Sequence, residues 1–206
     1  MNKEELKTKI KPIIKETIET VVFVVVMVII IRFFLGEIRW IPSGSMKPTL
    51  IEGDRIFVER VSRFFSTPKR GDVMVFYPPF EKLPHTPLKV FERLTGFFCK
   101  DIAYIKRVIG LPGDKILIKP DFDGKYAVYV NGKRLDEEYI MDDYDYTPCS
   151  KKMYCGPMTV PSNNYFMMGD NRGNSQDSRF WGFLPKERFV GRAVFLFWPF
   201  TRMKGL

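Results

Sequence analysis

Serine and lysine are the residue types in this chain that could together hydrolyse an acyl bond. Ser45 lies in the segment IPSGSMKPTL, residues 41–50, between Pro42 and Pro48 and directly after Gly44. Proline stiffens the backbone and glycine permits close approach, so this segment suits a nucleophile. The alternative is an ordinary linker rich in serine, glycine and proline.

The base that would activate Ser45 is expected to be a residue other than histidine. The chain has one histidine, His85, in the loop LPHTP, and an isolated loop histidine usually has no catalytic role. Lysine can serve as the base only when its amine is neutral. Because its ordinary pKa is about 10.4, burial must lower that pKa by several units.

Lys106 is the one lysine placed inside an apolar run, DIAYIKRVIG, residues 101–110. Alternate residues of an extended chain share a face, so Ile102, Tyr104 and Val108 lie on the same face as Lys106. This burial makes Lys106 a candidate general base. The alternative is that its amine reaches solvent or meets a carboxylate.

The composition favours a mainly β domain around these residues. The 206 residues are 45% hydrophobic and 15% aromatic, and they include 15 prolines, 15 glycines and three alanines, which is typical of a folded domain with little helix. Turn signals alternate with short β-like runs. They predict strands at 55–61, 73–77, 102–109, 116–119, 127–130, 133–135, 165–168 and 192–198.

An apolar stretch precedes this domain. Residues 21–31 form an uninterrupted run of eleven apolar residues, whereas a spanning helix needs roughly 17 to 25. Continuation of the helix on both sides predicts a transmembrane anchor over residues 20–36, uncleaved because no small-residue site follows it. Lysines within residues 1–19 favour a cytoplasmic N-terminus.

The formal net charge of +9 does not indicate a nucleic-acid partner, because the basic residues are scattered along the chain. An anionic lipid surface is the simpler partner. No spacing predicts a metal site or a cofactor motif, so we expect neither. Residues 80–100 look like an amphipathic insertion that packs on the core, the alternative being contact with lipid. The acidic run 136–145 is expected to be solvated.

Four separated motifs together resemble bacterial type I signal peptidase, also called leader peptidase, a serine protease family with a Ser-Lys dyad. They are PSGSMKPTL at 42–50, GDVMVFYPP at 71–79, YIKRVIGLPGD at 104–114 and GDNRGNSQDSR at 169–179. The resemblance covers essentially the whole chain after Arg39. It implies a barrel-like antiparallel catalytic domain at 37–206, with an accessory β lobe at about 115–165, behind one transmembrane helix.

The resemblance also assigns roles to individual residues. Ser45 would be the nucleophile and Lys106 the general base, with the Ser45 N–H and the Ser43 hydroxyl as the oxyanion hole. Ser175 would orient the lysine, supported by an ion pair of Asp177 with Arg179. Shallow pockets for small side chains would be lined by Ile41, Pro42, Met46, Leu50, Tyr104 and Ile105.

The implied activity is cleavage of signal peptides from exported preproteins after Ala-x-Ala sites, through an acyl-enzyme. The catalytic domain would lie on the outer side of the bacterial cytoplasmic membrane, and the secretion translocase is a further candidate partner. Two alternatives remain. One is a self-cleaving Ser-Lys protease of the repressor class, and the other is a membrane-tethered binding protein without enzymatic activity.

Two further features concern the cysteines and the C-terminus. Cys149 and Cys155, six residues apart, could close a small disulfide on the oxidising side of the membrane, which leaves Cys99 as a buried thiol. Near the C-terminus, Trp198 and Phe200 suit an interfacial contact with lipid.

Overall fold

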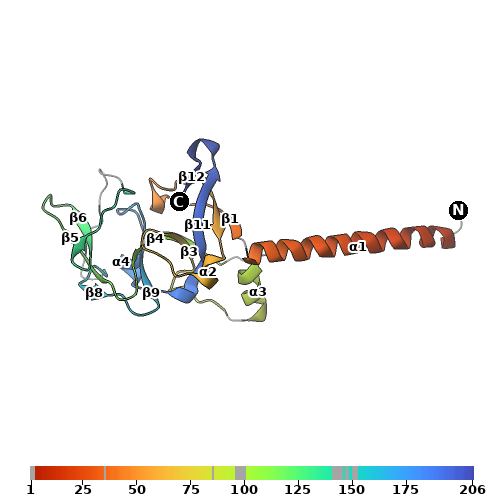
Figure 1. Cartoon of the computed structure of the whole chain (residues 1–206), viewed down its shortest axis with the longest axis horizontal. Helices are drawn as coiled ribbons and strands as arrows, with labels where there is room; N and C mark the ends of the chain where they lie inside the picture. The colour runs from red at the N-terminus through yellow and green to blue at the C-terminus, as the bar shows by residue number, and fades with distance from the viewer. Residues whose placement is uncertain are drawn as a thin grey trace.

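The chain folds into one long N-terminal helix followed by two antiparallel sheets (Figure 1). The computed structural model describes residues 3–34, 36–84, 86–95, 101–140, 146, 149 and 153–206, without the side chains of 3–10, 32–34, 63 and 94–95. His85 and Cys99 therefore lie outside the described residues.

The first sheet positions both candidate catalytic residues, since Lys106 lies in one of its strands and Ser45 in a turn between two of them. Its path runs β1-β2-β11-β3-β4-β9-β10, and β12 pairs with β11. The strands are β1 (Gly36–Trp40), β2 (Arg55–Glu59), β3 (Val73–Phe76), β4 (Tyr104–Gly110), β9 (Asn164–Met168), β10 (Leu184–Pro185), β11 (Phe189–Trp198) and β12 (Lys204–Gly205). The long strand β11 pairs with both β2 and β3, which brings the N-terminal and C-terminal parts of the domain together.

The second sheet occupies the region that the sequence places in an accessory lobe. Its order is β7-β6-β5-β8, with β5 (Lys115–Pro120), β6 (Tyr126–Val130), β7 (Lys133–Arg134) and β8 (Met158–Thr159). Asn131 and Gly132 join β6 to β7 with positive φ angles of 53° and 81°, as a tight hairpin turn requires.

The helices are few after the N-terminus. They are α1 (Lys3–Phe34), α2 (Ser62–Phe65), α3 (Pro87–Thr95) and α4 (Ser178–Trp181), with 3₁₀ turns η1 (Gly44–Met46), η2 (Lys186–Arg188) and η3 (Phe200–Arg202).

The hydrophobic core joins the two sheets. Ile109 of β4 and Phe166 of β9 are fully buried and belong to one cluster with Ile116 of β5 and Val128 of β6. Burial of such side chains stabilises the fold by roughly 1.5 to 3 kcal/mol each. The accessory lobe is therefore packed directly against the ends of the two central strands.

Helix α1 projects away from the β domain (Figure 1). Within the part of the chain that the structure describes, no helix is both long enough and apolar enough to cross a membrane. The transmembrane anchor expected over residues 20–36 is therefore not supported. The uninterrupted apolar run of this helix has eleven residues, 21–31, whereas a spanning helix needs roughly 17 to 25. The preceding segment 1–19 largely belongs to the same helix.

The insertion at 80–100 contains α3, which lies beside the end of α1 (Figure 1). The expectation that its apolar side chains pack on the core is wrong for Leu88 and Phe91, which are 67% and 50% exposed. Polar contacts hold this segment instead. Arg93 Nε donates to Asp101 Oδ2 at 2.6 Å, and Arg60 Nη2 donates to the Arg93 carbonyl at 2.7 Å.

Candidate active site

Ser45 lies at the centre of the 3₁₀ turn η1, just after β1. The next residue, Met46, is fully buried in the core, and the Leu50 N–H donates to its carbonyl at 2.9 Å. The turn is thus fixed from the inside by Met46 and Leu50, while Ser45 lines an open cleft.

Lys106 reaches the same cleft from β4, where it is paired with Met74 of β3. Its side chain is buried, with 3% of the residue exposed. The Nζ atom lies 2.6 Å from Ser45 Oγ and 3.0 Å from the Ile105 carbonyl oxygen. The structure therefore brings together the two residues that the sequence names as nucleophile and base.

The surroundings of Lys106 favour its neutral form. Burial lowers the pKa of Lys106 from its ordinary 10.5 to about 8, and the positive charge of Arg179 acts in the same direction. Asp177 and Asp170 oppose this shift by stabilising the ammonium. With a pKa of about 8, about one molecule in ten has a neutral amine at pH 7, compared with one in a few thousand for an ordinary lysine.

The loop of residues 169–179 closes over the nucleophile from the other side. The Asn171 N–H donates to the Ser45 carbonyl at 3.1 Å, and Asn171 Nδ2 donates to the Gly44 carbonyl at 3.0 Å. Gly169 leaves no space for a side chain, because a Cβ there would lie 2.2 Å from Ser175 Oγ and 2.4 Å from the Ser45 carbonyl oxygen. The loop and the turn of Ser45 are thus held in one arrangement.

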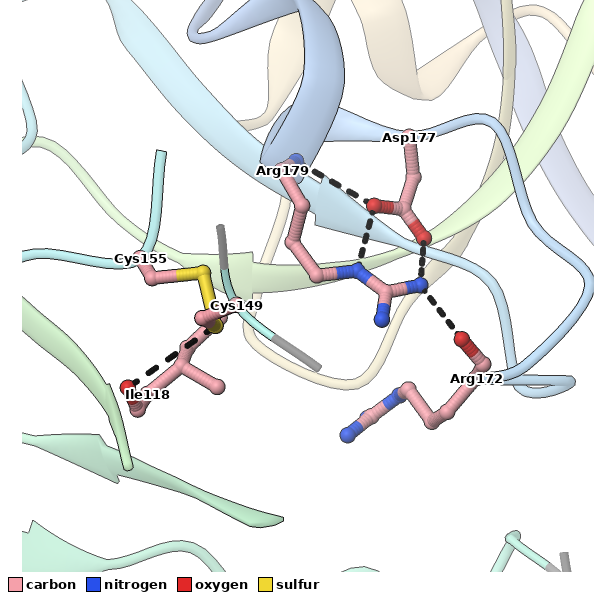
Figure 2. Close-up of a disulfide and its surroundings, with 6 residues drawn as sticks. All are labelled: Ile118, Cys149, Cys155, Arg172, Asp177 and Arg179. Atoms are coloured by element: carbon pink, nitrogen blue, oxygen red, sulfur yellow. Dashed lines mark hydrogen bonds and ion pairs between the residues drawn. A yellow bond between two sulfur atoms is a disulfide. The ribbon is translucent and has the colours of Figure 1, made fainter. Parts of the chain in front are cut away.

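Asp177 and Arg179 form a buried ion pair inside this loop (Figure 2). Arg179 Nε and Nη2 donate to the two carboxylate oxygens at 2.9 Å each, and Nη2 also donates to the Arg172 carbonyl at 2.8 Å. Asp177 Oδ2 accepts a hydrogen bond from the Gly169 N–H at 3.1 Å. Both side chains have no exposed surface, so the pair fixes the loop rather than contacting a substrate.

A second buried ion pair, which the sequence reasoning missed, joins Arg107 to Asp170. Arg107 Nε and Nη2 donate to the carboxylate oxygens at 2.9 and 2.6 Å, and Thr49 Oγ1 donates to Asp170 Oδ2 at 2.5 Å. The pair links the strand of Lys106, the loop and the segment of Ser45. The indication of this ion pair in the sequence was that Arg107 directly follows the candidate base, Lys106.

Ser43 and Ser175 make fewer hydrogen bonds than the resemblance implies. The hydroxyl oxygens of Ser43 and Ser45 are 3.4 Å apart, which is long for a hydrogen bond between hydroxyls. Ser175 Oγ is buried and has no hydrogen-bond partner among the described residues. The expected hydrogen bond from Ser175 to Lys106 is therefore not formed, although Ser175 lines the cleft beside Lys106.

The cleft has a volume of about 470 Å³ and is more apolar than polar along its walls. Of the predicted substrate-binding residues, Pro42, Tyr104 and Ile105 line it. The other three, Ile41, Met46 and Leu50, are buried in the core cluster that also contains Ile105, so their contact with substrate stays a prediction. The residues of the cleft that the sequence reasoning missed are Ile102, Ala103, Gly173, Asn174, Gln176 and Phe180.

The disulfide of Cys149 and Cys155 lies next to the loop (Figure 2). Tyr154, adjacent to Cys155, donates its N–H to the Arg179 carbonyl at 2.7 Å.

Trp198 and Phe200 lie at the C-terminal end of β11 and in η3, with 42% and 68% of their surface exposed and ring centroids 4.9 Å apart. Among the described residues, no group of histidine, cysteine or acidic side chains could hold a metal ion.

Comparison with known proteins places the chain in a family. The family model described as "Signal peptidase, peptidase S26" matches residues 14–198. The chain is 42% identical to "Signal peptidase I" of Leptolyngbya laminosa over 85% of its length and 75% of the relative's. It is 33% identical to "Signal peptidase I" of Bacillus licheniformis over 98% of its length and 97% of the relative's. A solved signal peptidase I from Enterococcus faecalis is 27% identical, with a TM-score of 0.43 over 62% of this chain and 97% of that one.

Proposed function

The chain belongs to the signal peptidase family, peptidase S26, and from this premise we propose that Ser45 and Lys106 are the catalytic dyad with which it cleaves signal peptides from preproteins. The observation that carries the proposal is the distance of 2.6 Å between Ser45 Oγ and Lys106 Nζ. A nucleophile and its base must lie within hydrogen-bond reach, and these two do.

The reaction follows from this geometry in two steps. Neutral Lys106 takes the proton of Ser45 Oγ as that oxygen attacks the scissile carbonyl, and it then returns a proton to the leaving amine. The result is an acyl-enzyme on Ser45. Lys106 next takes a proton from water as the water attacks the ester. It gives this proton to Ser45 Oγ as that oxygen leaves, which releases the signal peptide with a new carboxyl group and restores the dyad.

Donors for the oxyanion come from the turn of the nucleophile. We assign this role to the Ser45 N–H and to the Ser43 hydroxyl, which is exposed in the cleft and close to Ser45 Oγ. Removing one such donor typically lowers the rate about 100-fold to 1000-fold. Rotation of the Ser175 hydroxyl toward Lys106 would fix the amine when substrate fills the cleft.

The cleft suits a substrate with small apolar side chains. The residues that line it include Ala103, Tyr104 and Ile105 at and just before the start of β4, and Gly173 and Ser175 of the loop 169–179. An Ala-x-Ala sequence before the scissile bond would place small methyl groups on these walls. This supports the cleavage-site preference expected from the sequence.

We also propose that the apolar part of α1 tethers the enzyme to a membrane. Val21, Phe23 and Ile31 are 55%, 65% and 45% exposed on a helix that projects from the domain (Figure 1), and burial in lipid would remove this apolar surface from water. The disulfide favours an oxidising compartment for the β domain. Retention of the full chain on membranes after washing with high salt would support the tether, whereas release into the supernatant would reject it.

The test of the dyad is cleavage of a purified preprotein with an Ala-x-Ala site. Ser45→Ala and Lys106→Met should each abolish cleavage while the thermal unfolding midpoint stays near the wild-type value. Matched controls on exposed positions, Ser162→Ala and Lys115→Met, should keep full activity. Cleavage by either dyad variant at the wild-type rate would reject the assignment.

A further inference from the structure

Two residues of the accessory lobe reach into the active-site loop. Glu137 and Tyr139 follow β7 in a turn in which the Ile140 N–H donates to the Glu137 carbonyl at 3.1 Å. The acidic run that begins at Asp136 is expected from the sequence to be solvated. Glu137 departs from this expectation, because only 7% of its side chain is exposed.

Glu137 neutralises a buried arginine of the loop 169–179. Arg172 Nη1 donates to Glu137 Oε2 at 2.9 Å, and Nη2 makes a second bond to Oε1. The Arg172 side chain has no exposed surface, and its Nε donates to the Gly169 carbonyl at 3.1 Å. The carboxylate of Glu137 thus holds the guanidinium that fixes Gly169, the residue packed against the carbonyl of Ser45.

Tyr139 connects Glu137 to the strand of the general base. Its hydroxyl donates to Glu137 Oε1 at 2.8 Å, and the guanidinium of Arg107 lies 4.0 Å from the centre of its ring. Burial strongly raises the pKa of Tyr139, so the hydroxyl stays protonated and remains a donor. Arg107 directly follows Lys106 in β4, and its guanidinium also donates hydrogen bonds to Asp170 of the loop.

The contacts therefore form a closed path around the dyad. From Glu137 one branch runs through Arg172 to Gly169 and Ser45, and the other runs through Tyr139 to Arg107, next to Lys106. We propose that Glu137 and Tyr139 are positioning residues, which hold the nucleophile and the base of the proposed dyad at reacting distance from a different lobe of the protein. This inference rests on the proposed function.

Loss of the Glu137 carboxylate would remove a bidentate counter-ion from the buried charge of Arg172, which favours a rearrangement of the loop. Displacement of reacting groups by about 1 Å can lower the rate about 100-fold. Gly169 and Arg172, the two loop residues that Glu137 holds, are not among the residues that line the cleft, so KM should change less than kcat.

The experiment compares Glu137→Gln with Glu138→Gln in the full chain, using a preprotein with an Ala-x-Ala site. Glu138 is the adjacent exposed carboxylate and serves as a matched control. We expect kcat of Glu137→Gln to fall by about 100-fold, with KM changed by less than about twofold. Glu138→Gln should match the wild type, and Glu137→Asp, which keeps the charge, should recover part of kcat.

The pH profile separates positioning from a loss of folded protein. A loosened loop admits water to Lys106, which relieves the burial that lowers its pKa, so the acidic limb of kcat/KM should move above its wild-type position. The charged groups that face Lys106, namely Asp177, Asp170 and Arg179, are unchanged in this variant. A smaller folded fraction would lower kcat/KM by the same factor at every pH, and the acidic limb would stay at its wild-type position.

Unchanged kcat in Glu137→Gln, or a reduced kcat with an unmoved limb, would overturn the proposal. If Glu137→Gln does not fold, the proposal is tested with Tyr139→Phe and Glu137→Asp instead. Normal kcat in both of these variants would also overturn the proposal. Ser45→Ala is assayed in parallel. Cleavage by Ser45→Ala would mean that the dyad is wrong, whereas an inactive Ser45→Ala with a normal Glu137→Gln rejects the positioning role alone.

Discussion

Lys106 Nζ lies 2.6 Å from Ser45 Oγ, although the two residues are 61 positions apart in the chain. The contact depends on the register of β3 with β4, in which Lys106 is opposite Met74. It also depends on the turn η1, which buries Met46 and turns Ser45 into the cleft. The first two predictions below change the loop that packs beside this contact.

Gly169→Ala should strongly lower the rate of cleavage without preventing folding. The added Cβ would lie within 2.4 Å of the Ser45 carbonyl oxygen, so either the turn of Ser45 or the loop must move away. We expect kcat to fall by about 100-fold or more, measured with a preprotein substrate. Gly205→Ala is the control, because an added Cβ there meets nothing within 4 Å; a fully active Gly169→Ala would contradict the close packing.

Asp177→Asn should destabilise the domain by about 3 to 5 kcal/mol, because Arg179 keeps its charge in a fully buried site. Chemical denaturation gives this difference in the free energy of unfolding. The exposed neighbour of Glu137 supplies the control, Asp136→Asn, which should lie within about 0.5 kcal/mol of the wild type. Equal stability of Asp177→Asn and the wild type would show that the ion pair is not structural.

Replacing Cys149 and Cys155 with serine should lower the free energy of unfolding by about 2 kcal/mol, as the closure of a short loop predicts. Activity should also fall, because Tyr154 beside the disulfide bonds to Arg179. A reductant should reproduce both effects in the wild type and leave the double variant unchanged. A reductant that has no effect on the wild type would argue against the disulfide.

Trp198 and Phe200 should contribute to lipid binding. A chain that begins at Gly36, with both residues replaced by serine, is expected to bind anionic vesicles about tenfold more weakly in a flotation assay. The control is Phe122→Ser, since Phe122 is fully exposed in the turn between β5 and β6. If the double variant and the control bind equally, the contact with lipid does not involve this end of β11.

The sequence predicts strands well where turn residues bracket an apolar run. The run at 73–77 corresponds to β3 and the run at 127–130 to β6, because Gly and Pro mark their ends. Strand β1 (Gly36–Trp40) was missed, since it directly follows the apolar helix and has no turn signal of its own. Its partner β2 lies beyond the turn of Ser45.

The candidate site was harder to predict than the strands. The residue types and surroundings of Ser45 and Lys106 made them candidates, and the four motifs assigned their roles. Proximity to Ser45 in the sequence, however, does not show which way a neighbouring side chain points. Met46 and Leu50 are buried in the core cluster, and their contact with substrate stays a prediction. Glu137 could not be recognised, because its partner Arg172 is 35 positions away and an acidic run is most often solvated.

The most direct test of the central claim, that buried Lys106 is the neutral base for Ser45, is the pH dependence of kcat/KM in the wild type. Burial lowers the pKa of Lys106 to about 8, and the deprotonated amine is the active form. We predict that kcat/KM rises about tenfold per pH unit below that value and levels off above it. A rate that is constant from pH 6 to 9, or that rises until the ordinary lysine pKa of about 10.4, would contradict the claim.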